Sequence, residues 1–447
     1  MVLRIGTRPK GNFSYLSRAI VGAATVFIAI VTAHMKKALQ ILLKILKWAV
    51  VAILGFYFFG ITIFGFKKAN KSGSWDYYWS GIEAFWDSDE EFGFWTDKKM
   101  AAHFDGHDGP YIVNEHVFYV DSDSKMYSKK FNPQDSLLVK VNNDSKDSFY
   151  IKINKGYKAE AETHQLPKKL IAISDIEGNF NGFSSFLKSN KVIDNNYNWI
   201  YGDGHLVLVG DFVDRGDNVT QVLWLIYKLE QQAKVNNGKV HFILGNHEIM
   251  NFQGKWSYNN RKYPKVAQEV SGLKAWDKAT QFLYSKNTEL GRWLKTKNVI
   301  EKVGDYIFVH AGLSPEILEF ELSLSEINEI NSENWDYDLY NNPTDDNIAN
   351  FLIGRKGPIW YRGLAIDYKY YDKINEAELE RILTYYKSNK IVIGHTVVND
   401  ISTDFDGRVI KIDLKHGKTK NSGKTKGLLI EKGVEYKVDD LGNKEKI

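Results

Sequence analysis

Apolar runs that end in short polar loops dominate the chain from Lys169 onward. Five of them, KLIAIS, HLVLVG, VHFILG, DYIFVH and KIVIGH, have the length and composition of buried β-strands. Residues 220–234 and 376–388 instead carry apolar positions at helical spacing. The pattern predicts a layered α/β body whose site lies at the carboxyl ends of the strands. The stretches 249–304 and 313–389 interrupt the strand series and predict helical and loop insertions over that site.

Residues 72–166 follow a different pattern. They open on Trp75, Tyr77, Tyr78 and Trp79 and continue with the short alternating runs YIVNEHVFYV, SLLVKV and SFYIKI, separated by turn-forming residues. This alternation predicts a small antiparallel β region, which we interpret as an accessory subdomain or membrane-proximal spacer. Its histidines, at positions 103, 107 and 116, are scattered as surface histidines usually are.

The amino-terminal segment is strongly apolar. Residues 48–66 form a run of 19 residues without a charge, flanked by lysines and long enough to cross a membrane as a helix. A run of 15 residues at 19–33 is marginal for a second span, and one reading is a two-helix hairpin joined by residues 35–47. Another reading starts the chain at Met35. We favour a retained anchor over a cleaved signal peptide, because KKANKSGS offers a weak cleavage pattern.

The lysines around the apolar run bear on its orientation. With a start at Met35, four lysines precede the run and three follow it. The greater number of lysines before the run favours the periplasmic side for the main body. The anchor would then lie in a bacterial inner membrane. We therefore expect a membrane anchor at 1–71, the β-rich accessory region at 72–166 and a catalytic domain at 167–447.

Charge and cysteine content narrow the possible classes. Residues 1–71 hold 11 Lys or Arg and no acidic residue, so subtracting them from the net +4 leaves −7 for residues 72–447. A mildly acidic body argues against a nucleic-acid partner bound through phosphate neutralisation. The chain has no cysteine, so any metal must be held by His, Asp, Glu or Asn.

The predicted strands end in five short motifs that carry chemistry. Together they offer carboxylate, amide and imidazole groups, which suit divalent metal ions. The motifs are SDIEGN at 174–179, GDFVDRG at 210–216, GNHE at 245–248, VHAG at 309–312 and GHT at 394–396. Their order, each behind a strand-like run, makes a hydrolase with paired metal ions the leading hypothesis.

A pair of cations needs a bridging carboxylate and terminal ligands from several strands. Asp175 and Glu177 stand two apart and would share one side if the strand were still extended there. Asp211 is the candidate bridge, and the candidate ligands that complete the second metal are Asn246, His310 and His395. Two cations about 3.5–4 Å apart generate a hydroxide and hold the oxygens of an in-line phosphoryl displacement.

Charged residues beside these ligands suit phosphate chemistry. The planar guanidinium of Arg215 can bind two phosphate oxygens at once. His247, next to Asn246, can protonate a leaving oxygen, with Asp214 fixing its tautomer and supporting its charge.

These motifs resemble a known family. GDFVDRG, GNHE, VHAG and GHT are similar to the signature blocks of the phosphoprotein-phosphatase branch of calcineurin-like metallophosphoesterases. GDFVDRGDNVTQVLWLIYKLE, VHAGL and GPIWYRG at 357–363 are most similar to bacterial Shewanella-like phosphatases, and the likeness covers roughly 168–415. It implies Mn, Fe or Zn ions in a four-layered β-sandwich flanked by helices. We expect two divalent ions, Mn²⁺ first, with Fe, Zn or Mg as alternatives. The likeness also implies hydrolysis of phosphomonoesters, including phosphoserine, phosphothreonine and phosphotyrosine in proteins, by metal-bound water without a phosphoenzyme.

The resemblance assigns a role to each matching position. Asp175 and Asp211 match ligands of the first metal, and Arg362 in WYRG resembles a second phosphate-binding arginine. The remaining matches are Asn246, His310 and His395 at the second metal, Arg215 at the phosphate, and His247 with Asp214 as the acid pair. The family has histidine where this chain has Glu177, and the extra oxygen donor should favour Mn²⁺ or Mg²⁺ over Zn²⁺ at the first site.

The sequence therefore predicts a membrane-anchored, metal-dependent phosphatase acting on a phosphorylated protein or small molecule. A dinucleoside-polyphosphate or other nucleotide hydrolase with the same metal core is the enzymatic alternative. A catalytically degenerate, membrane-tethered binding protein is the alternative of another class, because the histidine at position 177 is missing. HGKTKNSGKT at 416–425 lacks the spacing of a phosphate-binding loop and predicts a flexible basic turn.

Overall fold

The computed structural model describes residues 13–447 except 65, 72–73, 81–90, 94–103 and 155. It divides into two compact units, Met1–Phe66 and Lys67–Ile447, each of which is described by itself. His103, one of the scattered histidines, lies outside the described residues.

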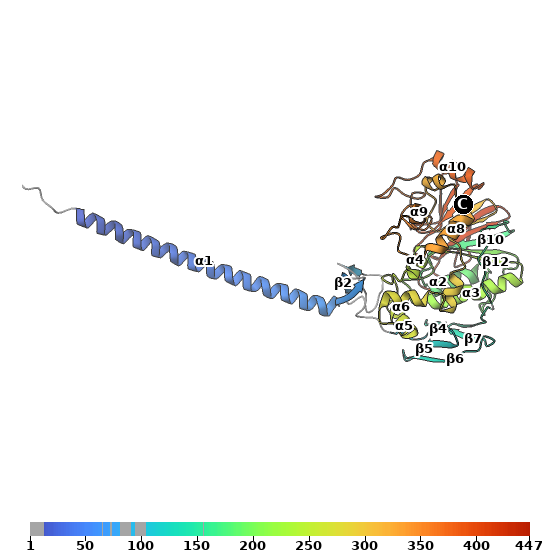
Figure 1. Ribbon diagram of the computed structural model, residues 1–447, viewed down its shortest axis with the longest axis horizontal. Helices are drawn as coiled ribbons and strands as arrows, with labels where there is room; N and C mark the ends of the chain where they lie inside the picture. Colours follow the sequence, from blue (N-terminus) through green and yellow to red (C-terminus); the bar gives the residue numbers. More distant parts are fainter. Residues whose placement is uncertain (1–12, 65, 72–73, 81–90, 94–103, 155) are drawn as a thin grey trace, which may run out of the picture. The chain divides into compact units, whose positions relative to one another are not determined.

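One long helix forms the described part of the first unit. Helix α1 (Phe13–Phe64) runs for 52 residues, and its stretch Thr25–Phe59 is apolar and long enough to cross a membrane (Figure 1). The reading of two spans joined by a connector at 35–47 is wrong, since the helix continues unbroken through that connector. MKKALQILLKILK consists of good helix formers and has neither Gly nor Pro to end a helix.

Two six-stranded sheets form the centre of the second unit. In order across the first sheet the strands are β12 (Lys239–Ile243), β11 (His205–Val209), β10 (Lys169–Ile173), β18 (Lys426–Glu431), β19 (Val434–Asp439) and β20 (Lys444–Lys446). The second sheet has the order β16 (Ser402–Asp404), β17 (Val409–Lys411), β15 (Lys390–Ile393), β14 (Tyr306–Val309), β13 (Ile300–Val303) and β9 (Thr163–His164). Strands β10, β11 and β12 are parallel, as are β14, β15 and β17, so their carboxyl ends share one edge in each sheet.

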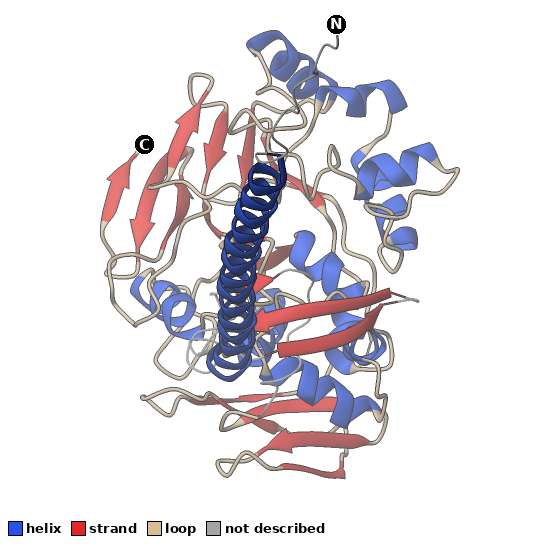
Figure 2. Ribbon diagram, turned by 90° about the vertical axis from the view of Figure 1, so that its left-hand side faces the viewer, coloured by secondary structure: helices blue, strands red, loops and turns tan. Residues whose placement is uncertain are grey.

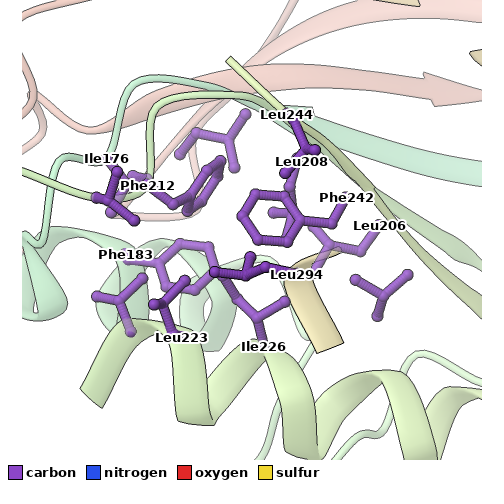
Figure 3. Packing of buried hydrophobic residues seen from close by; sticks show 14 of the residues in the cluster. Ile176, Phe183, Leu206, Leu208, Phe212, Leu223, Ile226, Phe242, Leu244 and Leu294 are labelled. Carbon is purple, nitrogen blue, oxygen red and sulfur yellow. The ribbon is translucent and has the colours of Figure 1, made fainter. Parts of the chain in front are cut away.

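Strands β10, β11, β14 and β15 are buried on both faces, as their unbroken apolar runs predict. Ala172 and Val207 of the first sheet share a buried cluster with Phe308 of the second, so this face lies between the sheets. The opposite face of the first sheet packs against α2 (Phe180–Ser189) and α3 (Val219–Val235). Figure 3 shows Leu206 and Leu208 of β11 beside side chains from these two helices.

The two interruptions of the strand series are largely helical, as expected. The first holds α4 (Asn246–Phe252), α5 (Lys262–Ser271), α6 (Trp276–Leu283) and α7 (Glu289–Leu294). The second holds the 3₁₀ helix η2 (Pro315–Phe320), α8 (Leu324–Asn334), α9 (Asn347–Ile353) and α10 (Glu376–Tyr385).

Antiparallel strands fill the region before the large sheets. They are β1 (Phe66–Lys71), β2 (Ser74–Ser80) and β3 (Glu91–Gly93) in one sheet, β4 (Asp108–Val113), β5 (His116–Val120) and β6 (Met126–Lys130) in another, and the pair β7 (Leu137–Lys140) and β8 (Ser148–Ile151). Strands β4 to β7 lie on the far side of α3, α5 and α6 from the large sheets (Figures 1 and 2).

Polar contacts join this β region to the helices. The buried Lys262 Nζ lies 2.7 Å from Asp108 Oδ2, and Trp224 donates its indole N–H to the Pro110 carbonyl at 2.8 Å. Apolar residues of β4, β5, β7 and β8 belong to the same buried cluster as those of α2 and α3. Strands β4, β5, β7 and β8 therefore share the hydrophobic core of the domain beside them.

Candidate metal centre

Each strand that leads to a motif ends just before the residues of interest, and the backbone then turns sharply. Asp175, Asp211 and His395 have φ values of 51°, 59° and 60°, in the left-handed region that non-glycine residues seldom adopt. Strand β10 ends at Ile173, so the alternation argued for Asp175 and Glu177 from an extended strand does not apply. The turns direct these residues to a common place at the strand ends.

Two motif glycines are required by close approach. A side chain on Gly245, in GNHE, would collide with the carboxylate of Asp211. One on Gly394, in GHT, would collide with the carboxylate of Asp175 and with Ser174. The glycines thus let loops from different strands come together.

Asp211, His310 and His395 form the tightest group at this site. One potential ligand atom from each lies within 4.8 Å of the others, and all are buried. His310 Nε2 lies 3.1 Å from Asp211 Oδ2 and 3.0 Å from Asn246 Oδ1. The buried Nε2 of His395 has no hydrogen-bond partner among the described residues. An unpartnered imidazole nitrogen beside a carboxylate and a second imidazole fits a divalent ion.

Asp175 adjoins this group and is joined by a residue that sequence reasoning missed. Asp175 Oδ2 accepts a hydrogen bond from the His395 backbone N–H at 3.2 Å. Asp413, two residues after β17, is buried, lines the same cavity and interacts electrostatically with Asp175. The sequence signal for Asp413 was its position at the end of the short run VIKID.

The buried acids and imidazoles perturb one another strongly. Burial and the Asp211 charge raise the pKa of Asp175 to about 7. Burial alone would raise the pKa of Asp211, but His310 and His247 hold it below its usual range. Burial opposes charge on His310, yet Asp211 raises its pKa to about 10. Because metal ions bind the deprotonated ligands, a cation here would displace protons from this network.

His247 is held by a dedicated acceptor. Its Nδ1 lies 2.6 Å from Asp214 Oδ2, and its Nε2 lies 3.8 Å from Asp211 Oδ2. Asp214 Oδ1 in turn accepts hydrogen bonds from the amides of Asn251 and Asn259. Burial disfavours the imidazolium, but the two carboxylates outweigh it and raise the pKa of His247.

Two arginines lie at the site. Arg215 Nη1 forms an ion pair with Glu177, so the carboxylate of Glu177 is directed to the arginine. The side chain of Arg215 is 41% exposed and that of Glu177 is 23% exposed. Arg362 donates to the His395 carbonyl at 2.5 Å and to Thr396 Oγ1 at 3.3 Å.

Glu248 has a positioning role that the sequence reasoning missed. Its fully buried carboxylate accepts hydrogen bonds from the backbone N–H groups of Asp211 at 2.9 Å and Gly245 at 2.8 Å. It therefore ties the loop after β11 to the loop after β12. The sequence signal for this role was the glutamate that ends the GNHE motif.

A cavity of about 1000 Å³ opens over the group. The predicted site residues that line it are Asp175, Glu177, Asp211, Arg215, Asn246, His247, Arg362 and His395. Lys415, His416 and Lys418 line it as well, and His416 Nε2 lies 2.8 Å from the Ser174 carbonyl oxygen. The basic turn is therefore packed against the loop that carries Asp175.

The fold and this cavity define a class. Residues 168–399 match the calcineurin-like phosphoesterase family, and the chain belongs to that family. It is a metal-dependent phosphoester hydrolase with a mixed α/β fold of sheets and helices.

Individual relatives refine the class. The chain is similar to "Shewanella-like protein phosphatase 1" of Plasmodium berghei, at 29% identity over 252 residues, 55% of this chain and 66% of that one. An uncharacterized protein of Schizosaccharomyces pombe is 30% identical over 283 residues, 60% of this chain and 79% of that protein. The crystal structure of a cold-active protein-tyrosine phosphatase of a Shewanella species superposes with a TM-score of 0.65 at 30% identity, covering 77% of this chain and 99% of that one. The predicted resemblance to Shewanella-like phosphatases is confirmed.

Proposed function

We propose that this protein is a dinuclear-metal phosphatase that hydrolyses phosphomonoesters, including phosphorylated serine, threonine or tyrosine in proteins. The observation that carries the proposal is the convergence of Asp211, His310 and His395 beside a cavity whose wall contains Asp211, His395 and two arginines. Relatives named as phosphatases support it.

The residues present fit a pair of metal ions. Asp211 would bridge them, with Asp175 at the first ion and Asp413 as a further oxygen donor there. Asn246, His310 and His395 would complete the second. The oxygen-rich first site favours Mn²⁺. When bound, the ions activate a water molecule and neutralise charge that develops on the phosphoryl group.

His247 is the proposed proton donor to the leaving oxygen. Its Nδ1 is committed to Asp214, so the tautomer and orientation of the ring are fixed and Nε2 is left beside the Asp211 carboxylate. The carboxylates of Asp211 and Asp214 raise the pKa of His247 and so favour the protonated ring that a general acid requires.

The arginines are proposed to bind the phosphate. Arg215 lies in the cavity wall with part of its side chain exposed, so it can exchange Glu177 for phosphate oxygens. Arg362 lies over the loop of His395 and would hold a second oxygen while it fixes that loop.

A substrate panel tests the proposal. The full-length protein in detergent would be stripped of metal, then assayed with p-nitrophenyl phosphate, phosphotyrosine and phosphoserine peptides and diadenosine tetraphosphate, with Mn²⁺, Mg²⁺, Fe²⁺ or Zn²⁺. We expect turnover of the monoesters, highest with Mn²⁺, and its loss in Asp211→Asn but not in the surface control His116→Gln. Preference for diadenosine tetraphosphate would favour the nucleotide hydrolase, and no turnover with any metal would favour the binding protein.

We also propose that α1 anchors the enzyme in a membrane, with the accessory region at 72–166 and the catalytic domain at 167–447. The uncharged apolar stretch of α1 and its flanking lysines support a retained anchor with the body on the periplasmic side. Resistance to extraction with alkaline carbonate, and digestion by protease added to spheroplasts, are the expected results.

A further inference from the structure

A second cluster of metal-binding side chains lies away from the catalytic cavity. His164 is on β9 and Glu301 on β13, neighbouring strands at one edge of the second large sheet. His241 is on β12, an edge strand of the first sheet, and His205 begins the adjacent strand β11. Within the described part of the chain, none of these four residues lines the catalytic cavity. The cluster therefore connects the edges of the two sheets at a separate place.

The three central side chains converge closely. Glu301 Oε2 lies 2.6 Å from His241 Nδ1 and 3.5 Å from His164 Nε2. The side chains of His241 and Glu301 are 0% and 1% exposed, whereas that of His164 is 15% exposed. One potential ligand atom from each lies within 4.8 Å of the others. Of these three side chains, only that of His164 is therefore appreciably exposed to solvent.

The spacing suits a small ion with nitrogen and oxygen ligands. Zn²⁺ lies about 2.0–2.2 Å from such ligands, so tetrahedral geometry sets neighbouring ligand atoms about 3.4 Å apart. The separation of 3.5 Å between His164 Nε2 and Glu301 Oε2 is close to this value, and that between His241 Nδ1 and Glu301 would open by less than about 1 Å. His164 Nε2 also contacts the Ala161 carbonyl at 2.8 Å, a hydrogen bond that a cation would replace.

Hydrogen bonds to neighbouring residues orient His241 and Glu301. His241 Nε2, the nitrogen that faces away from Glu301, lies 2.9 Å from His205 Nδ1. The other oxygen of Glu301, Oε1, accepts a hydrogen bond from Asn298 at 3.1 Å. Ligating histidines and carboxylates are typically held in this way by a second layer of hydrogen bonds. Lys239, on the same strand as His241, is paired with Glu160 at 2.7 Å.

We propose that His164, His241 and Glu301 bind a divalent transition-metal ion of the zinc class, separate from the catalytic pair, with a water molecule completing the coordination. The ion would fasten the edge of one large sheet to the edge of the other. This inference does not depend on the proposed function, because it concerns none of the catalytic residues. Its competitor is a metal-free relay of hydrogen bonds from His205 through His241 to the Glu301 carboxylate.

Metal stoichiometry separates the two accounts. Full-length protein in detergent, stripped with a chelator, would be titrated with Zn²⁺ and its metal content measured by mass spectrometry after desalting. His164→Gln and Glu301→Gln are the test variants, and His116→Gln, on the exposed side of β5, is the matched control. We expect the wild type and the control to retain one Zn²⁺ more per chain than either test variant. Equal Zn²⁺ content in all four proteins would overturn the proposal.

Cobalt gives a spectroscopic readout that is independent of turnover. In an Asp211→Asn background, which weakens the catalytic centre, Co²⁺ should still produce the visible bands of a tetrahedral site. Adding His164→Gln should abolish these bands, and bands that persist would contradict the proposal. His164 is partly exposed on a two-residue edge strand, so its variant tests the site even if Glu301→Gln fails to fold.

Discussion

At the scale of single residues, the pairing of Glu177 with Arg215 is the feature that most changes the expected chemistry. The sequence suggested Glu177 as a metal ligand in place of histidine, and that role stays a prediction. The structure directs its carboxylate to the arginine that is proposed to bind phosphate. Substrate must then compete with Glu177 for Arg215.

Removing the carboxylate should therefore improve binding. In Glu177→Ala we expect the KM for p-nitrophenyl phosphate to fall by about two- to fivefold, because a partly exposed ion pair contributes less than about 1 kcal/mol. The Mn²⁺ content should stay unchanged. A loss of Mn²⁺ on mass spectrometry would instead identify Glu177 as a ligand, and Glu177→His would then be expected to raise affinity for Zn²⁺.

His247 should matter according to the leaving group. In His247→Gln we expect kcat for a phosphoserine peptide to fall by about 10²-fold or more, since an alkoxide needs a proton as it departs. The loss should be much smaller for p-nitrophenyl phosphate, whose leaving group is a weak base. Equal losses for both substrates would contradict the assignment.

The raised pKa of His247 also fixes the direction of its pH effect. A general acid is active when protonated, so kcat for the phosphoserine peptide should decline as pH rises through the pKa of His247. The pH profile of His247→Gln should lack this decline of kcat at high pH. If the variant still shows the decline, another titrating group causes it.

At the scale of elements, apolar runs locate the strands well, and most of the candidate site residues that follow them line one cavity. The turns themselves could not be predicted, because the left-handed backbone at Asp211 and His395 depends on contacts from other loops. Asp413 escaped notice because β17 has only three residues and no familiar motif follows it. The partner of Glu177 depends on the folded loop after β11, which spacing alone does not reveal.

The close approach at Gly394 offers a test at this scale. In Gly394→Ala the added methyl group would meet the Asp175 carboxylate, so we expect weaker Mn²⁺ binding and kcat lower by at least about tenfold, as a small displacement of a ligand can produce. Gly156→Ala is the control, since open space surrounds that glycine. Equal Mn²⁺ titrations and rates for both variants would show that the loop can shift freely.

At the scale of the whole molecule, strands β4, β5, β7 and β8 share a hydrophobic core with the catalytic part. The alternating runs predicted its strands, but the sequence could not show that Asp108 would pair with Lys262, 154 positions later, because that contact depends on tertiary packing. The side chains of this pair are 1% and 2% exposed. Helix α1 also runs unbroken through residues 35–47, whereas the lengths of the two apolar runs alone suggest two separate helices.

The buried pair predicts a large effect on stability. In Asp108→Asn the ammonium of Lys262 stays buried without its counter-charge, which should lower the free energy of unfolding by about 3–5 kcal/mol. Denaturant titration followed by tryptophan fluorescence measures this. Glu269→Ala, which removes the exposed partner of Lys265, should change stability by less than about 0.5 kcal/mol. Similar shifts for both variants would argue against a structural role for the buried pair.

The left-handed backbone at Asp175, Asp211 and His395 has a consequence for the protein in a living cell. Each such residue costs about 1 kcal/mol or more when nothing compensates it, and ligation of a metal ion would offset that cost. Without its metal ions the enzyme would then be both inactive and more readily degraded by proteases. Supply of the ion would control abundance and activity together.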